Sequence, residues 1–332
     1  MALDSKLLGQ AKAKLNKKRM INEAETERRT NEVCLKNPRV LEIDKELQAL
    51  MAEAIQFALK KGDNISSTIG LIEKKSLAMQ EERIDEILAM GLPADYLEEK
   101  YTCPDCRDTG YVGTEICSCL MSLYNEELRL SLSSLITGNG ENFDRFKLNY
   151  YDSAPDPESG KSAQDYMEVV YEICVRYAMK FGGNSFNLYL YGAPGLGKTF
   201  LSACIANAVI DKGYSVVYDV AGNVFSVFED YKFQKNDEYE VLRGDINRYL
   251  NCDLFIIDDL GTEMTTAFTL SVLYEIINSR LIAGKKTIIN SNYAPNDFKG
   301  RYSEQIISRL NGDYKVLKFH GKDIRLVKNK NN

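Results

Sequence analysis

The chain has 332 residues, of which 44% are hydrophobic and 27% are charged, and its formal net charge at pH 7 is -6. This length fits about two domains of roughly 150 residues each. The acidic balance argues against a protein coated in cations for nucleic acid, so any DNA contact must be local. No segment approaches the ~20 continuous apolar residues that span a bilayer, and the N-terminus lacks the pattern of a signal peptide, so we expect a cytoplasmic protein.

Residues 1–99 are charged and helical in pattern, and we expect them to form a helical partner-binding region. Apolar side chains recur there at alternating spacings of three and four residues, which puts them on one helix face. The residues of this face are Val40, Ile43, Leu47, Leu50, Ala54 and Phe57. The face must bury against something, and the pattern leaves two alternatives open: other helices of the same domain, or a partner helix.

Four cysteines are clustered in the sequence CPDCRDTGYVGTEICSC. Cys103 and Cys106 have the spacing C-x2-C, and Cys117 and Cys119 follow as C-x-C. A turn of this kind places two thiolates on one metal, and a glycine-rich hairpin brings the second pair to complete a tetrahedral set of sulfurs, which favours zinc. Reduced, unligated thiols or a redox pair are the alternative. We expect residues 100–141 to form a zinc-binding segment and a connecting helix, in which the metal holds the fold and does not catalyse.

Between residues 142 and 332, strand-like apolar runs alternate with helical patterns. The runs are NLYLYG, YSVVYDV, DLFIIDDL and KTIINSN. This alternation predicts an α/β domain in which helices cover both faces of a parallel sheet. The polar stretch at residues 152–164 contains two prolines and is expected to be a loop near the start of the domain.

The strongest motif of the chain is GAPGLGKT at residues 192–199, which fits the pattern G-x4-GK[ST]. It follows a strand-like run and precedes a helical pattern, as a phosphate-binding loop requires. Its glycines let backbone N–H groups reach the phosphates, Lys198 places a charge near the β- and γ-phosphates, and the Thr199 hydroxyl can ligate Mg²⁺. The expected nucleotide-binding residues are Gly192, Ala193, Pro194, Gly195, Leu196, Gly197, Lys198, Thr199 and Phe200.

The run LFIIDD supplies the second half of the expected site. Its apolar residues predict a buried strand, whose end presents Asp258 to hold Mg²⁺ and Asp259 to polarise the attacking water. The later run KTIINSN also ends in polar residues, and Asn292 is the expected tip that positions the water from the neighbouring strand. Asn290 is the competitor for that role.

The P-loop and the segments NFDRFKLNYYDSAPDPESG, IIDDLGTE, TIINSN, RYSEQIISRL and FHGKDIRL together resemble the DnaC/DnaI type of replicative helicase loader, within the AAA+ ATPase family. The similarity covers about residues 100–328 and implies an AAA+ P-loop NTPase fold that uses ATP. By motif position, Asn292 matches sensor 1, Arg309 matches the arginine finger that reaches a neighbouring subunit's γ-phosphate, and Arg325 matches the sensor 2 arginine. The expected catalytic set is Lys198, Asp258, Asp259, Asn292, Arg309 and Arg325.

The resemblance also implies that single-stranded DNA lies along the inner face of a spiral of ATPase domains. The turn GTEMTTAFT matches the DNA-facing segment, with Thr266 and Phe268 as candidates. Tyr231, Lys232 and Phe233 form a second set, because aromatic stacking with a few cations suits unpaired bases. Burial in the core is the alternative for Phe268 and Phe233.

The implied function is ATP-dependent loading of a DnaB-like replicative helicase onto single-stranded DNA during replication initiation or restart. ATP binding and hydrolysis would control delivery and release, with self-association through the ATPase domains. Many AAA+ proteins carry Glu at the position of Asp259, so we expect slow hydrolysis. Two alternatives stay open: an IstB-like helper ATPase for DNA transposition, and an adaptor that binds nucleotide without significant hydrolysis. The expected cofactors are ATP, Mg²⁺ and Zn²⁺.

Overall fold

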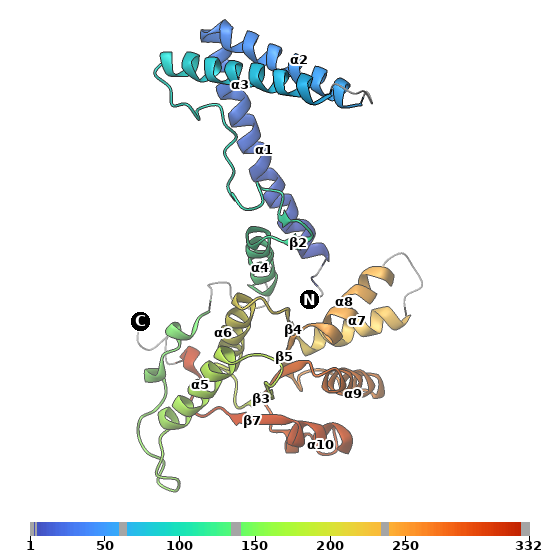
Figure 1. Cartoon of the computed structure of the whole chain (residues 1–332). Coiled ribbons are helices and arrows are strands. Elements are labelled where there is room, and N and C mark those ends of the chain that lie inside the picture. The colour runs from blue at the N-terminus through green and yellow to red at the C-terminus, as the bar shows by residue number, and fades with distance from the viewer. Residues whose placement is uncertain (1–2, 4, 60–64, 134–140, 234–238, 327–332) are drawn as a thin grey trace. The chain divides into compact units, whose positions relative to one another are not determined.

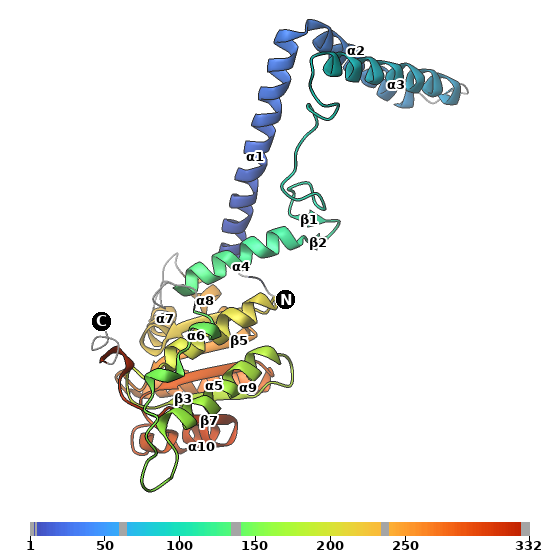
Figure 2. The same ribbon diagram turned by 90° about the vertical axis from the view of Figure 1, so that its left-hand side faces the viewer.

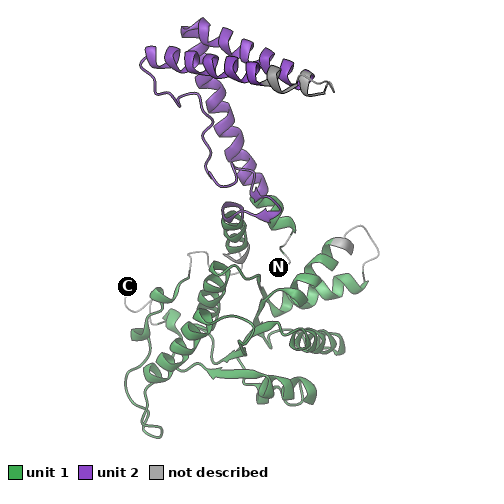
Figure 3. Ribbon diagram, in the orientation of Figure 1, with its two compact units in different colours: residues 1–11, 121–332 green, residues 12–120 purple. Residues whose placement is uncertain are grey.

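The computed structural model describes residues 3, 5–59, 65–133, 141–233 and 239–326. The chain forms two compact units, one of residues 12–120 and one of residues 1–11 with 121–332 (Figure 3). Within the described ranges, the structure has no helix that is long and apolar enough to cross a membrane. The domain boundaries expected at residues 99 and 141 stay predictions.

The unit of residues 12–120 contains most of one long helix, a helical hairpin and a small β-hairpin (Figure 1). Its elements are α1 (Ser5–Lys36), α2 (Pro38–Leu59), α3 (Ile65–Ala89), β1 (Tyr111–Val112) and β2 (Glu115–Ile116). Helix α2 starts with a proline, which is tolerated in the first turn because the N–H there has no partner within the helix.

The apolar face expected on α2 packs against helix α3 of the same unit. Ile43 and Leu50 are buried together with Met79 of α3, and Leu47 packs on them. Val40 is buried in a neighbouring cluster with Ile87 of α3. This part of the face therefore follows the first alternative, burial inside the helical region, while the side chain of Phe57 lies outside the described residues.

The unit that holds the P-loop is built on a five-stranded parallel sheet with the strand order β4-β5-β6-β3-β7. The strands are β3 (Asn187–Tyr191), β4 (Val216–Val220), β5 (Leu254–Leu260), β6 (Lys286–Ser291) and β7 (Tyr314–Lys318). Most residues of β3, β4, β5 and β6 are buried, as strands covered on both faces require. The four strand-like runs of the sequence are thus confirmed as sheet strands.

Helices cover both faces of this sheet (Figures 1 and 2). Helices α5 (Ala163–Met179) and α6 (Lys198–Asp211) lie on one face. Helices α7 (Ala221–Phe233), α9 (Ala267–Ile282) and α10 (Glu304–Gly312) bury their apolar residues in a single core cluster with β5 and β6 on the other. The remaining elements are α4 (Ser118–Ser133), α8 (Tyr239–Asn251), η1 (Phe143–Arg145), η2 (Leu148–Tyr150) and η3 (Pro295–Phe298). The predicted α/β class, with helices on both faces of a parallel sheet that carries the P-loop, is confirmed.

The loop expected at residues 152–164 ends slightly earlier, because α5 begins at Ala163. Ser162 caps this helix: its hydroxyl accepts a hydrogen bond from Asp165 N, and the Asp165 carboxylate accepts one from Ser162 N. Such a reciprocal cap satisfies two backbone donors that a helix start leaves without partners.

Candidate nucleotide-binding site and cysteine cluster

The P-loop follows strand β3, which lies between β6 and β7, and leads directly into α6. Gly195 and Gly197 have φ angles of 75° and 89°, which lie in the left-handed region that side chains disfavour. A Cβ atom at Gly197 would lie 3.1 Å from the Tyr151 hydroxyl. These positions therefore need glycine, and the free N–H groups at the start of α6 remain available for an anion.

Lys198 lies at the first position of α6 with its side chain folded back over the loop. Its ammonium group donates to Gly192 O at 2.7 Å, to Ala193 O at 2.9 Å and to Asn292 Oδ1 at 2.9 Å. Burial lowers the pKa of Lys198, and the carboxylates of Asp259 and Asp258 oppose that shift. The structure thus brings the P-loop lysine and the predicted sensor 1 residue into direct contact.

Asp258 lies in β5, next to the P-loop helix. Its Oδ2 atom accepts a hydrogen bond from Thr199 Oγ1 at 2.9 Å, and its Oδ1 atom accepts one from Asn290 Nδ2 at 2.9 Å. A carboxylate and a hydroxyl oxygen side by side are ligands that suit Mg²⁺, so the donor set fits this ion. Thr199 and Asp258 are the residues that would hold it.

The two candidate asparagines make different contacts. Asn290 is fully buried and touches Asp258, whereas Asn292 follows β6 and touches Lys198. Only Asn292 therefore sits against the P-loop lysine, and its role as sensor 1 stays a prediction.

Asp259 has an exposed side chain and a left-handed backbone with φ of 53°. Non-glycine residues adopt this conformation rarely, and such outliers cluster at functional sites. Partial desolvation, and then the adjacent Asp258 charge, raise the pKa of Asp259. A carboxylate with a raised pKa is a better proton acceptor, which suits the predicted contact with an attacking water.

The segment after β7 runs back across the P-loop. Phe319 N donates to Tyr191 O at 2.7 Å, and Ile324 N donates to Gly195 O at 3.1 Å. This places the exposed Arg325 near enough for its charge to act on the pKa of both Lys198 and Asp259. The predicted sensor 2 arginine therefore lies beside the P-loop of its own chain.

Arg309 lies elsewhere, on α10, on the sheet face opposite to the P-loop helix. Its guanidinium pairs with Asp313 at 3.2 Å and donates to Asn278 Oδ1 at 3.4 Å. Among the described residues, these two are the polar partners of its side chain. The structure does not bring Arg309 to the P-loop of its own chain.

An aromatic group beside the P-loop and a tyrosine in β4 were not predicted from the sequence. The Tyr151 hydroxyl donates to Leu196 O at 2.9 Å, and the Phe146 ring packs near Phe200 and stacks on Tyr171. Tyr218 of β4 donates its hydroxyl to Asp258 Oδ2. The aromatic run NFDRFKLNYY was a usable hint for the first group, whereas Tyr218 looked like any strand residue.

The two segments proposed for DNA contact come together in the structure. The Lys232 ammonium lies 5.0 Å from the centre of the Phe268 ring and 5.8 Å from that of Phe233. Phe233 is 67% exposed, whereas Phe268 is partly buried against the core. Tyr231 is half-buried on α7. Thr266 caps α9, because its hydroxyl accepts a hydrogen bond from Thr269 N.

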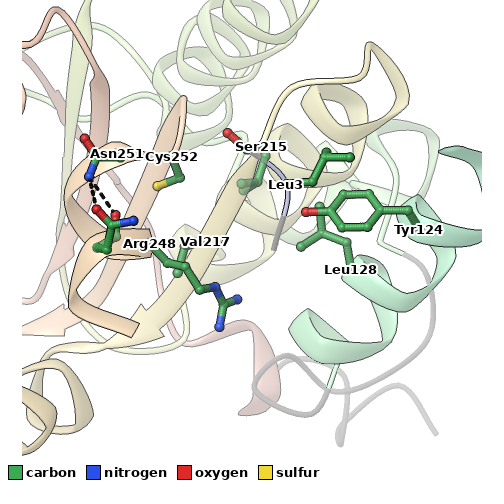
Figure 4. Close-up of a pocket in the computed structure, with 10 residues that line it drawn as sticks. Leu3, Tyr124, Leu128, Ser215, Val217, Arg248, Asn251 and Cys252 are labelled. Atoms are coloured by element: carbon green, nitrogen blue, oxygen red, sulfur yellow. Dashed lines mark hydrogen bonds between the residues drawn. The ribbon is translucent and has the colours of Figure 1, made fainter. Parts of the chain in front are cut away.

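A separate small cavity of about 70 Å³ lies beside β4 (Figure 4). Its lining includes Leu3, Tyr124, Leu128, Val217 and Cys252. No predicted site residue is among the lining residues. It is smaller than the ~300 Å³ that small-molecule sites usually offer, so we assign it no ligand.

The four clustered cysteines converge as predicted. Their Sγ atoms all lie within 4.8 Å of one another, with 3.7 Å between Cys103 and Cys117 and 3.3 Å between Cys106 and Cys119. A tetrahedral zinc site with Zn–S bonds of ~2.3 Å requires sulfurs roughly 3.8 Å apart, so this set fits the ion. Gly110 N also donates to Cys106 Sγ at 3.3 Å, and a backbone N–H bond of this kind orients a thiolate that binds a metal.

We expect one zinc ion per purified chain, measured by atomic absorption, and its loss in the Cys103→Ser, Cys117→Ser double variant. The hairpin has little core apart from the cysteines themselves, so the variant should also lose thermal stability in the unit of residues 12–120. Cys34→Ser, a change of a cysteine outside the cluster in the same unit, should retain the metal. A metal-free chain that keeps full stability would contradict the zinc prediction.

The sequence also has relatives among known proteins. Residues 173–331 match the family model of the IstB-like ATP binding proteins. The replicative helicase loader DnaC of Escherichia coli (strain K12) is 24% identical over 135 residues, which cover 41% of this chain and 54% of DnaC. The replicative helicase loader DnaI of Bacillus subtilis (strain 168) is 30% identical over 125 residues, which cover 36% of this chain and 38% of DnaI.

A crystal structure of the DnaC helicase loader is similar with 20% identity and a TM-score of 0.42, covering 54% of this chain and 97% of that chain. The chain spans about half the length of the curated relatives that it matches. The resemblance carried by the motifs is thus confirmed: the chain is similar to the IstB-like ATP binding proteins over residues 173–331, and to the DnaC and DnaI helicase loaders over part of its length.

Proposed function

We propose that this protein is an ATP-dependent loader of a DnaB-like replicative helicase onto single-stranded DNA, in which ATP binding and hydrolysis control delivery and release. The observation that carries the proposal is the joint placement of Lys198, Asn292, Thr199 and Asp258 at one edge of the sheet, in a chain similar to DnaC and DnaI.

The roles in hydrolysis follow from these positions. The P-loop N–H groups and Lys198 bind the β- and γ-phosphates, and Thr199 with Asp258 would hold Mg²⁺, which neutralises charge on those phosphates. Asp259 accepts a hydrogen bond from the attacking water and orients it. Its short side chain, where many AAA+ proteins have Glu, positions the water less well, so turnover is slow.

Assembly is coupled to hydrolysis through Arg309. Its place on α10, on the face opposite to α6, supports a role at the site of a neighbouring subunit rather than at its own. A guanidinium stabilises the charge that develops on the transferred phosphoryl group, so the site is complete only in an oligomer.

The helical unit would bind the helicase. Helix α3 exposes Leu77, Ile84 and Leu88 at spacings of seven and four residues, which places them in one stripe along the helix. Apolar side chains in a stripe of this kind are what helix-in-groove recognition uses. Met79, the residue of α3 that packs against Ile43 and Leu50 of α2, is not part of this stripe. Residues 1–99 therefore keep an exposed apolar surface for a partner.

The cluster of Phe233, Phe268 and Lys232 supports local contact with single-stranded DNA despite the acidic net charge. An exposed ring can stack on a base, and an adjacent ammonium can approach the phosphate backbone. We expect Phe233→Ala to weaken ssDNA binding about tenfold, because loss of one base stack costs ~1–3 kcal/mol.

This weakening is measured by fluorescence anisotropy with a labelled oligonucleotide in the presence of ATP. Phe186→Ala is the matched control, because Phe186 is also exposed and also lies beside a lysine, with Lys315 Nζ 5.2 Å from the ring centre. Equal affinities of both variants and the wild type would contradict the placement of the DNA contact.

The match of residues 173–331 to the IstB-like family keeps a second function open, that of a helper ATPase for DNA transposition. Such a helper shares the nucleotide site but binds a transposase. The two functions therefore differ in their protein partner, which one experiment can decide.

That experiment is size exclusion with light scattering of the full chain mixed with the replicative helicase of the same source, in ATP and in ADP. The loader proposal expects a complex whose amount or size depends on the nucleotide, and which Ile84→Asp weakens. Ile282→Asp, which changes an exposed apolar residue of the ATPase unit, should leave the complex intact. The absence of a complex in either nucleotide, with ssDNA binding retained, would favour the transposition helper.

A further inference from the structure

The hydroxyl of Tyr218 reaches the carboxylate that is proposed to hold Mg²⁺. Tyr218 lies in β4 and is only 3% exposed, and its hydroxyl donates to Asp258 Oδ2. In the register of the two strands, Val220 pairs with Asp258, so Tyr218 lies two residues before that position on the neighbouring strand. The long side chain spans this offset and places a fixed O–H donor at the end of β5.

This contact completes the surroundings of Asp258. Oδ2 accepts from Tyr218 and from Thr199 Oγ1, while Oδ1 accepts from Asn290 Nδ2 and from the backbone N–H of Asp259. Tyr218 and Asn290 come from β4 and β6, the strands on either side of β5. Since each oxygen has two donors from fixed elements, the carboxylate has one defined orientation.

The hydrogen-bond chain continues into the P-loop helix. Asn290 Oδ1 accepts from Ser202 Oγ at 2.8 Å, and Ser202 lies one turn after Lys198 in α6. The orientation of Asp258 is therefore set jointly by the two neighbouring strands and by the helix that presents Lys198 and Thr199. Loss of a partner that orients a metal ligand in this way typically lowers metal affinity by about 10–100-fold.

We propose that Tyr218 is a positioning residue for magnesium-dependent nucleotide binding, acting through Asp258 and touching neither the ion nor the phosphates. The inference rests on the proposed ATPase function. Removing the Tyr218 hydroxyl leaves Oδ2 with the Thr199 hydroxyl alone, so the carboxylate gains rotational freedom at the place where it must meet the ion. The binding of phosphates by the P-loop itself does not depend on this contact.

A second tyrosine of the same domain separates this role from ordinary core structure. Tyr249 is 5% exposed and donates its hydroxyl to Asp219 Oδ2 at 2.6 Å, so it forms the same kind of buried tyrosine–aspartate pair. Asp219 takes its other hydrogen bonds from Val220 N and Asn223 Nδ2, neither of which belongs to the nucleotide site. Tyr249→Phe thus removes an equivalent buried hydrogen bond without touching Asp258.

The test is calorimetric titration of the full chain with a nonhydrolysable ATP analogue, once with EDTA and once with Mg²⁺. For Tyr218→Phe we expect an affinity in EDTA within about twofold of the wild type, and a loss of about tenfold in the gain that Mg²⁺ provides. Tyr249→Phe should keep the whole magnesium-dependent gain while showing a similar loss of thermal stability.

An unchanged gain in nucleotide affinity with Mg²⁺ in Tyr218→Phe would overturn the inference. The same holds if Tyr249→Phe loses this gain to the same extent, or if Mg²⁺ does not raise the affinity of the wild type. Because the readout is binding and not turnover, a protein that shows the expected pattern but never hydrolyses ATP or binds a helicase would refute the proposed function alone.

Discussion

Replacing Arg309 with alanine is expected to slow ATP hydrolysis by about 10³-fold while nucleotide affinity stays close to that of the wild type, since arginine fingers contribute on this scale to the transition state. The guanidinium of Arg309 is bound to Asp313 and Asn278 on the face of the sheet opposite to α6, so its removal leaves the P-loop of its own chain untouched. The loss should therefore appear in kcat and not in ATP binding.

The measurement is steady-state phosphate release with ssDNA present, alongside nucleotide titration of the same variant. Arg309→Lys should remain strongly impaired, because an ammonium lacks the planar fork of a guanidinium. Arg176→Ala, which removes an exposed arginine of α5, should hydrolyse ATP normally. Wild-type turnover in Arg309→Ala would remove the arginine from the catalytic set.

Lys198→Ala is expected to lower hydrolysis by at least about 10²–10³-fold, the usual cost of removing one preorganised donor from developing charge. The change also removes the ammonium group that donates hydrogen bonds to Gly192 O, Ala193 O and Asn292 Oδ1. Nucleotide affinity should therefore fall together with the rate of hydrolysis. Lys212→Ala is the matched control, because Lys212 lies at the opposite end of the same helix.

A mixture of the two inactive variants gives the sharpest readout. An interface with the intact P-loop of an Arg309→Ala subunit and the intact arginine of a Lys198→Ala subunit has every predicted group, so the mixture should regain part of the wild-type rate. No recovery at any mixing ratio, with oligomers still formed, would show that Arg309 does not act across the interface. Turnover of Lys198→Ala alone at the wild-type rate would contradict the nucleotide site as a whole.

Some features of this protein follow from short stretches of sequence. The P-loop is one, because its motif residues lie next to one another in the sequence. The glycines permit the left-handed φ angles of the loop, and the lysine and threonine at fixed spacing supply the groups that contact phosphate and Mg²⁺. The cysteine hairpin is another, since the two pairs are joined by only the ten residues 107–116, and the short hairpin that these form brings the pairs together. The four buried strand runs and the loop before α5 were also readable, because burial and turn residues leave local patterns.

Contacts between distant segments were decided only by the tertiary structure. Lys198 meets Asn292 across 94 residues of sequence, and Asp258 meets Tyr218 across 40 and Asn290 across 32. Each contact depends on the strand order and on the register of adjacent strands, neither of which a single strand pattern contains. For the same reason the sequence left Asn290 and Asn292 as competitors. In the structure, Asn290 lies within β6 and contacts Asp258, whereas Asn292 follows β6 and contacts Lys198.

Which helix surfaces are covered was also decided by the tertiary structure. The apolar periodicity of α2 showed that a face is buried but not what covers it, because any apolar partner satisfies the pattern. Its cover by α3 became visible only in the folded unit. Likewise, Phe233 and Phe268 are far apart in the sequence, and they lie close together because α7 and α9 pack on the same face of the sheet. The sequence by itself thus determined which residues form the candidate nucleotide site and the cysteine cluster. The tertiary structure decided which other side chains contact them, because those partners come from separate strands and helices.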